Sequence, residues 1–359
     1  MGLHRIEAWQ MEAGKPELVR TTRELDGLAP GEVLIEVAGC GVCHTDLGFF
    51  FDGVRTGHAL PLTLGHEIAG RVADTGPGAE AWRGRAVVVP AVMPCGDCEL
   101  CRTGYGTICR AQKFFGSDVH GGFASHVVAP ARGLCPVDTD RLAATGLELA
   151  DLGVLADAIS TPFQAIERAE VRAGDVTIFV GAGGVGGFGA QIAHALGAHV
   201  VAIDVDAARL EKLKAYGVDL TLDSRALDAK AIKAAIGELA ASKRAGRVRW
   251  KIFETSGHPA GQELAFSLLT FGSILSVVGY TLEKVHVRLS NLMAFDAIAR
   301  GNWGCVPERY PAALELILDQ KIAVAPFIER RPMSRINETF AQLRAHELKL
   351  RPVLVPDFR

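Results

Sequence analysis

The chain has 359 residues, of which 49% are hydrophobic and 22% charged, and its 38 Lys and Arg nearly balance its 41 Asp and Glu. This length predicts about two domains. The balanced charge gives no indication of the basic surface of nucleic-acid or membrane-surface binders, so we expect neither partner. Residues 1–15 carry charges and lack a long apolar stretch, so we expect no signal peptide and a cytoplasmic location.

Short strand-like segments separated by turn residues fill roughly the first 150 residues. A Pro-Gly pair precedes an alternating Val/Ile run within 28–43, residues 85–95 form an apolar run with internal proline, and glycines open a third run at 121–130. This pattern predicts a strand-rich domain with long functional loops.

Strands and helices alternate from about residue 160. The run 176–181 is continuously apolar, as expected for a parallel strand covered on both faces, and a glycine-rich turn and a helix-like stretch follow it. Such alternation predicts βαβ units and a doubly wound parallel sheet. The remaining expected elements are strands at 200–204, 219–223, 251–257, 272–280 and 351–356 and helices at 207–217 and 312–322.

The stretch from Val176 to Ile203 contains no Asp, Glu, Lys or Arg and could be mistaken for a membrane span. Seven glycines interrupt it, as do the polar side chains of Gln191, His194 and His199. A buried strand followed by a buried helix is therefore the better interpretation.

Four of the eight cysteines form the pattern C-x2-C-x2-C-x7-C at Cys95, Cys98, Cys101 and Cys109. Two-residue gaps let successive thiolates converge on one ion, and a longer loop brings the fourth. Four sulfur ligands leave no open position, so the spacing predicts a structural zinc site. An iron–sulfur cluster is the weaker alternative, and four unrelated thiols the weakest.

A G-x-G-x-x-G pattern lies at 181–186, between an expected strand and an expected helix. The first glycine permits the tight turn, the second lets a pyrophosphate approach the backbone, and the third lets helix and strand pack closely. The pattern predicts a dinucleotide site. The turn comprises Gly181, Gly183, Gly184, Val185 and Gly186.

An acidic residue, Asp204, ends the next expected strand. Its carboxylate would accept hydrogen bonds from the adenosine ribose hydroxyls and repel a 2′-phosphate, which favours NAD over NADP. Arg209 either lies over the adenine ribose and softens that preference or is a solvated helix residue.

Two further motifs, GCGVCHTD (39–46) and LGHEIAG (64–70), carry Cys43, His66 and Glu67. A thiolate and an imidazole are typical zinc ligands, and a catalytic zinc has three protein ligands and an open position. With the four-cysteine segment and the glycine-rich turn, these motifs occur in the order found in zinc-dependent medium-chain alcohol dehydrogenases. The chain resembles that family over nearly its whole length.

The resemblance implies an α/β architecture in two domains. A GroES-like, strand-rich catalytic domain would comprise 1–158 and 306–359, with the structural zinc lobe at 95–109, and a Rossmann coenzyme domain would comprise 159–305. It also implies NAD, one catalytic and one structural zinc per subunit, a small alcohol as substrate, and a homo-oligomer, with a tetramer favoured over a dimer.

Residues of the catalytic site follow from the same resemblance. Cys43, His66 and Asp157 match the zinc ligands, although many relatives have cysteine where this chain has Asp157; a buried structural acid is the alternative there. Glu67 matches a carboxylate behind the metal that acts as a transient ligand. Thr45 matches the hydroxyl that contacts the substrate oxygen and begins a proton relay.

Coenzyme contacts are implied at four more positions. His44 and Arg351 match residues beside the pyrophosphate, Thr161 a residue near the nicotinamide ring, and Val278 the backbone beside the nicotinamide amide.

One position departs from the family pattern. Many relatives have histidine five residues after the zinc cysteine, as the outlet of the proton relay, and here that residue is Gly48. The proton must leave by another route. His58 and His120 are either replacements or ordinary loop histidines.

The segment 44–67, with three phenylalanines at 49–51, predicts a bulky apolar pocket or ordinary packing. As a whole the chain resembles the 6-hydroxycyclohex-1-ene-1-carbonyl-CoA dehydrogenases of anaerobic benzoyl-CoA degradation. That resemblance implies NAD-linked oxidation of a cyclic allylic alcohol, carried as a CoA thioester, to the 6-oxo product. The alternatives are a general or aryl alcohol dehydrogenase, a zinc-free quinone or enoyl reductase, and a non-catalytic nucleotide-binding protein.

Overall fold

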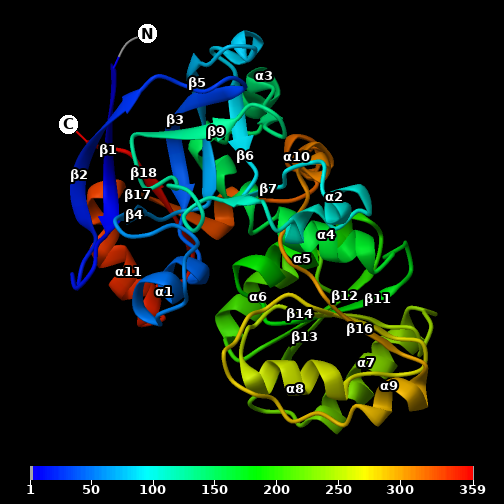
Figure 1. Ribbon diagram of the computed structural model, residues 1–359. Helices are drawn as coiled ribbons and strands as arrows, with labels where there is room; N and C mark the ends of the chain where they lie inside the picture. Colours follow the sequence, from blue (N-terminus) through cyan, green and yellow to red (C-terminus); the bar gives the residue numbers. More distant parts are fainter. Residues whose placement is uncertain (1–2, 359) are drawn as a thin grey trace. The chain divides into compact units, whose positions relative to one another are not determined.

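The computed structural model describes residues 3–358 and divides into two compact units (Figure 1). Unit 1 comprises the residues up to Ser160, Gly304–Leu318 and the chain from Val324 onward, and unit 2 comprises Thr161–Trp303 and Asp319–Ala323. None of the helices in the described residues has the length and apolar character needed to cross a bilayer.

Unit 1 is rich in strands, as its alternating and turn-punctuated sequence predicts. Within the described chain its largest sheet has the order β10-β6-β5-β3-β18-β17, with β9 also paired to β3, and smaller sheets have the orders β2-β1-β4 and β7-β8. The strands are β1 (Leu3–Met11), β2 (Val19–Asp26), β3 (Glu32–Gly41), β4 (Leu62–Thr63), β5 (Glu67–Thr75), β6 (Ala86–Val89), β7 (Val92–Met93), β8 (Lys113–Phe114), β9 (His126–Pro130), β10 (Cys135–Pro136), β17 (Ile328–Pro332) and β18 (Arg351–Val355).

Short helices complete unit 1. They are α1 (His44–Phe51), α2 (Glu99–Arg102), α3 (Thr139–Ala144), α10 (Tyr310–Leu318), α11 (Ile336–Arg344) and the 3-10 helix η3 (Leu149–Ala156). The core beneath them is built from the inward side chains of the strands, such as Val33, Ile35 and Ile68, all fully buried.

Three neighbouring strands, β18, β3 and β5, position the functional residues of unit 1. β18 and β5 both pair antiparallel with β3, with Val353 opposite Gly41 and Gly41 opposite Glu67. Arg351 begins β18, so this register places Arg351 and Glu67 on either side of the end of β3. Residues from three distant segments thus meet at one edge of the sheet.

Unit 2 contains the predicted doubly wound parallel sheet, with helices on both of its sides (Figure 1). Its order in the described residues is β13-β12-β11-β14-β15-β16, and β11 is buried along its whole length, as its continuous apolar sequence predicts. The strands are β11 (Val176–Val180), β12 (His199–Asp204), β13 (Leu220–Asp223), β14 (Lys251–Glu254), β15 (Ile274–Val277) and β16 (Ile298–Gly301). The helices are α4 (Ser160–Arg168), α5 (Gly184–Ala195), α6 (Ala207–Lys214), α7 (Ala229–Ser242), α8 (Pro259–Ser267) and α9 (Ser290–Phe295).

The uncharged stretch from Val176 to Ile203 therefore forms β11, α5 and β12. A buried strand and a largely buried helix account for its composition, as predicted.

Candidate functional site

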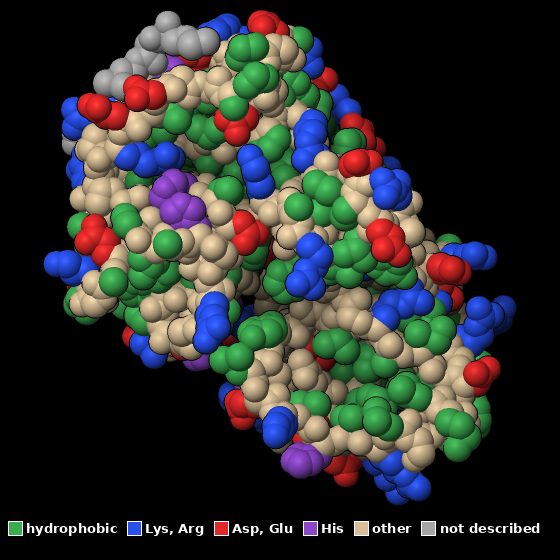
Figure 2. All heavy atoms as spheres, in the orientation of Figure 1, with side chains coloured by type: hydrophobic (Ala, Val, Ile, Leu, Met, Phe, Trp, Pro, Cys, Tyr) green, Lys and Arg blue, Asp and Glu red, His purple; other side chains and the backbone are tan. Residues whose placement is uncertain are grey.

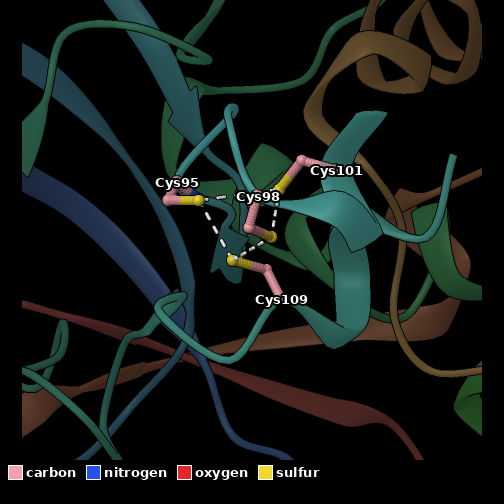
Figure 3. A group of neighbouring side chains, drawn as sticks. All are labelled: Cys95, Cys98, Cys101 and Cys109. Atoms are coloured by element: carbon pink, nitrogen blue, oxygen red, sulfur yellow. Dashed lines mark hydrogen bonds between the residues drawn. The ribbon is translucent and has the colours of Figure 1, made fainter. Parts of the chain in front are cut away.

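Four cysteine thiols converge in the lobe at 95–109 (Figure 3). Cys98 precedes α2, Cys101 lies within it, and Cys95 and Cys109 come from the loops on either side. The Sγ–Sγ distances are 3.8 Å for Cys95–Cys101, 3.4 Å for Cys98–Cys101 and 3.6 Å for Cys98–Cys109. Sulfur atoms bound to a tetrahedral zinc at ~2.3 Å lie ~3.8 Å apart, so the cluster fits one zinc ion and leaves it no open position.

The backbone of this lobe favours a thiolate at Cys95, whereas burial raises the pKa of Cys101 to about 12. Hydrogen bonds from the backbone N–H groups of Asp97 and Cys98 lower the pKa of Cys95 to about 6. A lowered thiol pKa favours the deprotonated form that binds zinc.

A second cluster in unit 1 gathers Cys43, His66, Glu67 and Asp157. One possible ligand atom from each lies within 4.8 Å of the others. Asp157 Oδ2 is 3.5 Å from Cys43 Sγ and 3.6 Å from His66 Nε2. Ligands held at 2.0–2.3 Å around a tetrahedral ion are spaced by roughly these distances, so the three side chains fit one zinc ion.

Local structure presents each of these ligands. Cys43 is the residue directly before α1. His66 lies just before β5, and Asp157 directly follows η3. All but Asp157 are buried, and the Asp157 side chain is 18% exposed, so the cluster has its opening beside this carboxylate.

Asp46 supports the cluster from behind, a role that our sequence prediction missed. Its Oδ1 lies 3.4 Å from His66 Nδ1 and accepts from the Gly65 N–H, and its Oδ2 accepts from the Cys43 N–H. A carboxylate behind a ligating imidazole fixes the ring so that the other nitrogen faces the metal. The motif CHTD contains this residue, so its signal was present in the sequence.

The side chains around His66 carry negative charge that a bound cation would balance. Burial by itself lowers the pKa of His66, but the carboxylates of Asp46 and Asp157 outweigh it and raise the pKa well above its ordinary value. Two carboxylates and a thiol therefore face this imidazole in a buried space. A divalent cation would balance their charge.

Glu67 and Arg351 form a buried pair. Arg351 Nε donates to Glu67 Oε2 at 2.8 Å, Arg351 Nη2 donates to Oε1 at 2.5 Å, and the Ala158 N–H also donates to Oε1. Burial raises the pKa of Glu67, and the positive charge of Arg351 opposes that shift. Arg351, expected beside the coenzyme phosphates, is thus held by the carboxylate behind the cluster, and its contact with phosphate stays a prediction.

Apolar rings form a wall beside the cluster. The rings of Phe114 and His66 have centroids 5.3 Å apart, and Phe114 in turn contacts Phe49 at 6.2 Å. Phe50 and Phe51 instead pack against Phe340 of α11. Of the three phenylalanines at 49–51, only Phe49 is connected to the cluster, and the other two make ordinary packing contacts.

The proton-relay residues are divided between two places. The Thr45 hydroxyl lies 3.7 Å from Cys43 Sγ, and Gly48 is one turn further along α1. His58 and His120 lie beside each other, with ring centroids 4.9 Å apart, and His120 Nδ1 accepts from the Thr63 N–H. The geometry links these two histidines to each other rather than to Thr45.

In unit 2 the glycine-rich turn joins β11 to α5, and the structure separates the roles of its glycines. Gly181 has a φ of +102°, which favours glycine, and a Cβ at Gly186 would lie 1.8 Å from the Gly181 carbonyl oxygen. A Cβ at Gly183 would meet only Arg209 Nη1, at 3.9 Å. The first and third glycines are therefore required by the fold, whereas the second borders open space.

Asp204 accepts hydrogen bonds from backbone N–H groups beside this turn. One carboxylate oxygen accepts from the Ala182 N–H at 2.6 Å and the other from the Asp206 N–H at 2.8 Å. A carboxylate has about four acceptor positions, so both oxygens keep capacity for ribose hydroxyls.

The other predicted coenzyme residues lie as follows. Thr161 is buried in α4 and its carbonyl accepts from Asn302, while the Val278 N–H donates to the carbonyl oxygen of Glu254. His44 is exposed, with its ring stacked on His346 at a centroid distance of 6.4 Å. Their coenzyme contacts stay predictions.

Comparison with known proteins agrees with this geometry. Residues 29–139 match the alcohol dehydrogenase GroES-like domain, and residues 184–319 match the zinc-binding dehydrogenase family. An alcohol dehydrogenase of Rhizobium meliloti is 31% identical over 316 residues, which cover 87% of this chain and 88% of that protein. The chain belongs to the zinc-dependent medium-chain alcohol dehydrogenase family.

Two other relatives widen the comparison. Galactitol 1-phosphate 5-dehydrogenase of Escherichia coli is 28% identical over 87% of each chain. The cobalt- and zinc-bound thermostable alcohol dehydrogenase of Pyrobaculum aerophilum is 25% identical, with a TM-score of 0.83 over 98% of this chain and all of that one. The expected GroES-like domain, Rossmann-type parallel sheet and dehydrogenase class are confirmed, and the zinc-free and non-catalytic alternatives lose their support.

Replacing Gly41 tests the buried pair of this dehydrogenase. A Cβ in Gly41→Ala would lie 2.0 Å from Glu67 Oε2, so the carboxylate must leave Arg351. We expect kcat/KM to fall about 10- to 100-fold, because a hydrogen bond between charged groups contributes about 1.5–3 kcal/mol. The matched control is Gly237→Ala, where the added Cβ meets nothing within 4 Å. Equal steady-state kinetics for the two variants would show that the pair does not support the site.

Proposed function

We propose that this dehydrogenase oxidises a secondary cyclic alcohol to the ketone with NAD, and that its substrate is 6-hydroxycyclohex-1-ene-1-carbonyl-CoA or a close analogue. The observation that carries the activity is the convergence of Cys43, His66 and Asp157 within metal-ligand spacing. The substrate assignment depends on the resemblance of the whole chain to that family of dehydrogenases.

The cofactors supply the chemistry that the side chains lack. Zinc, held by Cys43, His66 and Asp157, supplies when bound the Lewis acidity that favours loss of a hydroxyl proton, and NAD supplies the nicotinamide that takes up hydride. Thr45, beside Cys43 and partly exposed, is placed to accept a hydrogen bond from the alcohol hydroxyl and to relay its proton to solvent water, giving up its own hydroxyl proton as it takes the other. Glu67 keeps a negative charge behind the ligands, and Arg351 holds that charge in place.

Binding of NAD is supported by the glycine-rich turn and by Asp204. The turn places the N-terminus of α5 where it can face a pyrophosphate, and the open space at Gly183 leaves room for it. The carboxylate of Asp204 disfavours a 2′-phosphate. Because Arg209 reaches over Gly183, its guanidinium is placed to contact the phosphates as well.

Gly183→Ala is the sharpest test of that coenzyme site. The fold has room for this methyl group, so we expect an unchanged melting temperature. NAD+ binding, measured by fluorescence titration, should be about 10- to 100-fold weaker, because the methyl group displaces the phosphate from the backbone N–H donors. Gly187→Ala, in the first turn of α5, is the control, since the added Cβ makes only ordinary contacts at 3.5 Å or more. Wild-type affinity in Gly183→Ala would exclude the turn as the pyrophosphate site.

The apolar wall of Phe49 and Phe114 supports a cyclic substrate, because it places aromatic surface beside His66. A polyol phosphate is the second candidate, favoured by the similarity to the Escherichia coli galactitol 1-phosphate 5-dehydrogenase. The rings of the wall offer no hydrogen bonds to a polyol chain, so we rank this candidate second.

A substrate panel separates these candidates. The zinc-loaded enzyme is assayed with NAD+ against the cyclic hydroxyacyl-CoA, free cyclohexanol, benzyl alcohol and galactitol 1-phosphate. We expect kcat/KM for the thioester to exceed that for cyclohexanol at least about 100-fold, which corresponds to about 2.7 kcal/mol of additional binding in the transition state. If cyclohexanol or benzyl alcohol reacts equally well, the enzyme is a general or aryl alcohol dehydrogenase.

We also propose that the enzyme is cytoplasmic and forms a homo-oligomer, with a tetramer favoured over a dimer. The free thiols of its eight cysteines support a reducing compartment. Light scattering of the purified enzyme determines the subunit number.

A further inference from the structure

Charged side chains of both signs are spread over the face of the protein drawn in Figure 2, whereas Tyr310 places a polar hydroxyl in the interior of unit 1. Tyr310 is the first residue of α10, and its side chain is fully buried. Its Oη donates to the Ala156 carbonyl oxygen at 2.5 Å and accepts from the Ala91 N–H at 3.2 Å. Because a backbone N–H can only donate and a carbonyl oxygen can only accept, the phenol proton must point at Ala156.

The Tyr310 hydroxyl joins segments that are far apart in the sequence. Ala91 lies between β6 and β7, and Ala156 is the last residue of η3, directly before the ligand Asp157. Both alanines are buried, so their backbone groups depend on partners within the protein. The hydroxyl therefore ties the chain next to a zinc ligand to a separate loop of the same unit.

The backbone of Asp157 is neither helical nor extended. Its φ is −139° and its ψ is −59°, and it directly follows a 3-10 helix. Regular secondary structure therefore does not set the direction in which the carboxylate points. That direction depends on how the peptide groups before and after Asp157 are held.

Each of the two peptide groups that flank Asp157 accepts or donates a hydrogen bond to a side chain. The group before it carries the Ala156 carbonyl, which accepts from Tyr310 Oη. The group after it carries the Ala158 N–H, which donates to Glu67 Oε1 at 3.1 Å. Since a peptide group is a rigid plane, holding both planes fixes φ and ψ of Asp157, and with them the direction of its Cα–Cβ bond.

We propose that Tyr310 is a positioning residue that aims the carboxylate of Asp157 at the catalytic zinc. The inference rests on the proposed function, in which Asp157 is the third protein ligand of that ion. The Asp157 side chain is 18% exposed, whereas Cys43 and His66 are buried. Packing confines this carboxylate less than it confines the other two ligands, so the hydrogen bonds of the flanking backbone matter more for its placement.

The zinc affinity of Tyr310→Phe, measured by competition with a chelator, tests the proposal. Phenylalanine keeps the buried ring and loses only the hydroxyl, so the chain before Asp157 loses its link to Ala91. We expect the catalytic zinc to bind about 10- to 100-fold more weakly, as when other groups that orient a metal ligand are removed, while the structural zinc stays bound. Thr339→Val is the matched control, because it removes another fully buried hydroxyl of unit 1, which donates to the Arg335 carbonyl at the start of α11.

Cobalt spectra distinguish positioning of the ligand from a purely structural role. With cobalt in place of both zinc ions, the visible absorption bands report the geometry of the ligands, and the bands of the four-cysteine site serve as an internal reference. The bands of the catalytic site should shift in Tyr310→Phe and stay unchanged in Thr339→Val. A lower melting temperature of Tyr310→Phe with wild-type bands and wild-type zinc affinity would make Tyr310 a structural residue and overturn the proposal.

Asp157→Ala separates this inference from the proposed function, because it should lose the catalytic zinc. If Asp157→Ala loses the ion and Tyr310→Phe keeps wild-type affinity, only the positioning role fails. If Asp157→Ala also keeps wild-type affinity, the ligand set of the proposed function fails together with the inference.

Ser160→Ala keeps the proposal testable if Tyr310→Phe does not fold. Ser160 Oγ is the other donor to the Ala156 carbonyl, at 3.1 Å, and it is also fully buried. Its removal should weaken zinc binding severalfold and shift the same cobalt bands. Unchanged zinc affinity and unchanged bands in Ser160→Ala would show that the hydrogen bonds of this carbonyl do not aim Asp157.

Discussion

Cys43→Ser is expected to lower kcat/KM by about four orders of magnitude and to reduce the zinc content by one ion per chain. Loss of one of three protein ligands releases the catalytic zinc, and with it several kcal/mol of transition-state stabilisation. The fold should persist, since serine has nearly the same shape as cysteine and Cys43 is not part of the hydrophobic core of unit 1. The measurements are steady-state kinetics and metal analysis by mass spectrometry.

Cys40→Ala is the control for that experiment. Cys40 is a fully buried thiol three residues earlier, at the end of β3, and it lies outside both ligand clusters. Its replacement should keep both zinc ions and most of the activity. Two zinc ions and wild-type kinetics in Cys43→Ser would contradict the assigned ligand set.

Cys98→Ser is expected to remove the other zinc ion and to lower the melting temperature by about 10 °C. Cys98 Sγ is within 3.6 Å of both Cys101 Sγ and Cys109 Sγ, so its loss opens the cluster. We expect the order of the lobe to depend on the ion, because the lobe has little core of its own. A loss of several kcal/mol in the free energy of unfolding, at about 2 °C per kcal/mol, gives this shift in melting temperature. Calorimetry and metal analysis provide the readout.

The catalytic zinc should stay in Cys98→Ser, because its ligands come from other segments of unit 1. Cys135→Ala, a buried thiol outside the clusters, is the matched control. If Cys98→Ser retained both ions and the wild-type melting temperature, the four thiols would not form a structural site.

Local spacing is the reason that some of these features could be predicted from the sequence. Cys95, Cys98 and Cys101 lie within one short segment, and the turn at Gly181 joins adjacent elements, so the pattern alone specifies the geometry. The parallel sheet of unit 2 was equally accessible, because a short, continuously apolar run such as β11 is typical of a parallel strand covered on both faces.

Long-range pairing is the reason that other features could not be predicted. Arg351 and Glu67 are 284 positions apart and meet only because β18 and β5 both pair with β3, a register that no local pattern encodes. Asp157 was identified through the family resemblance alone. The three adjacent phenylalanines at 49–51 appeared equivalent, yet the helical period directs Phe49 and Phe50 to different neighbours.

The distance in sequence between Glu67 and Arg351 also bears on how the enzyme matures. During synthesis the carboxylate emerges from the ribosome long before its guanidinium partner, and an ionised carboxylate is not stable in an apolar interior without one. The end of β3 must therefore stay hydrated or loosely packed until β18 is made and inserts beside it. Metal loading and the onset of turnover should accordingly be late events, which occur after translation of Arg351 and docking of its strand.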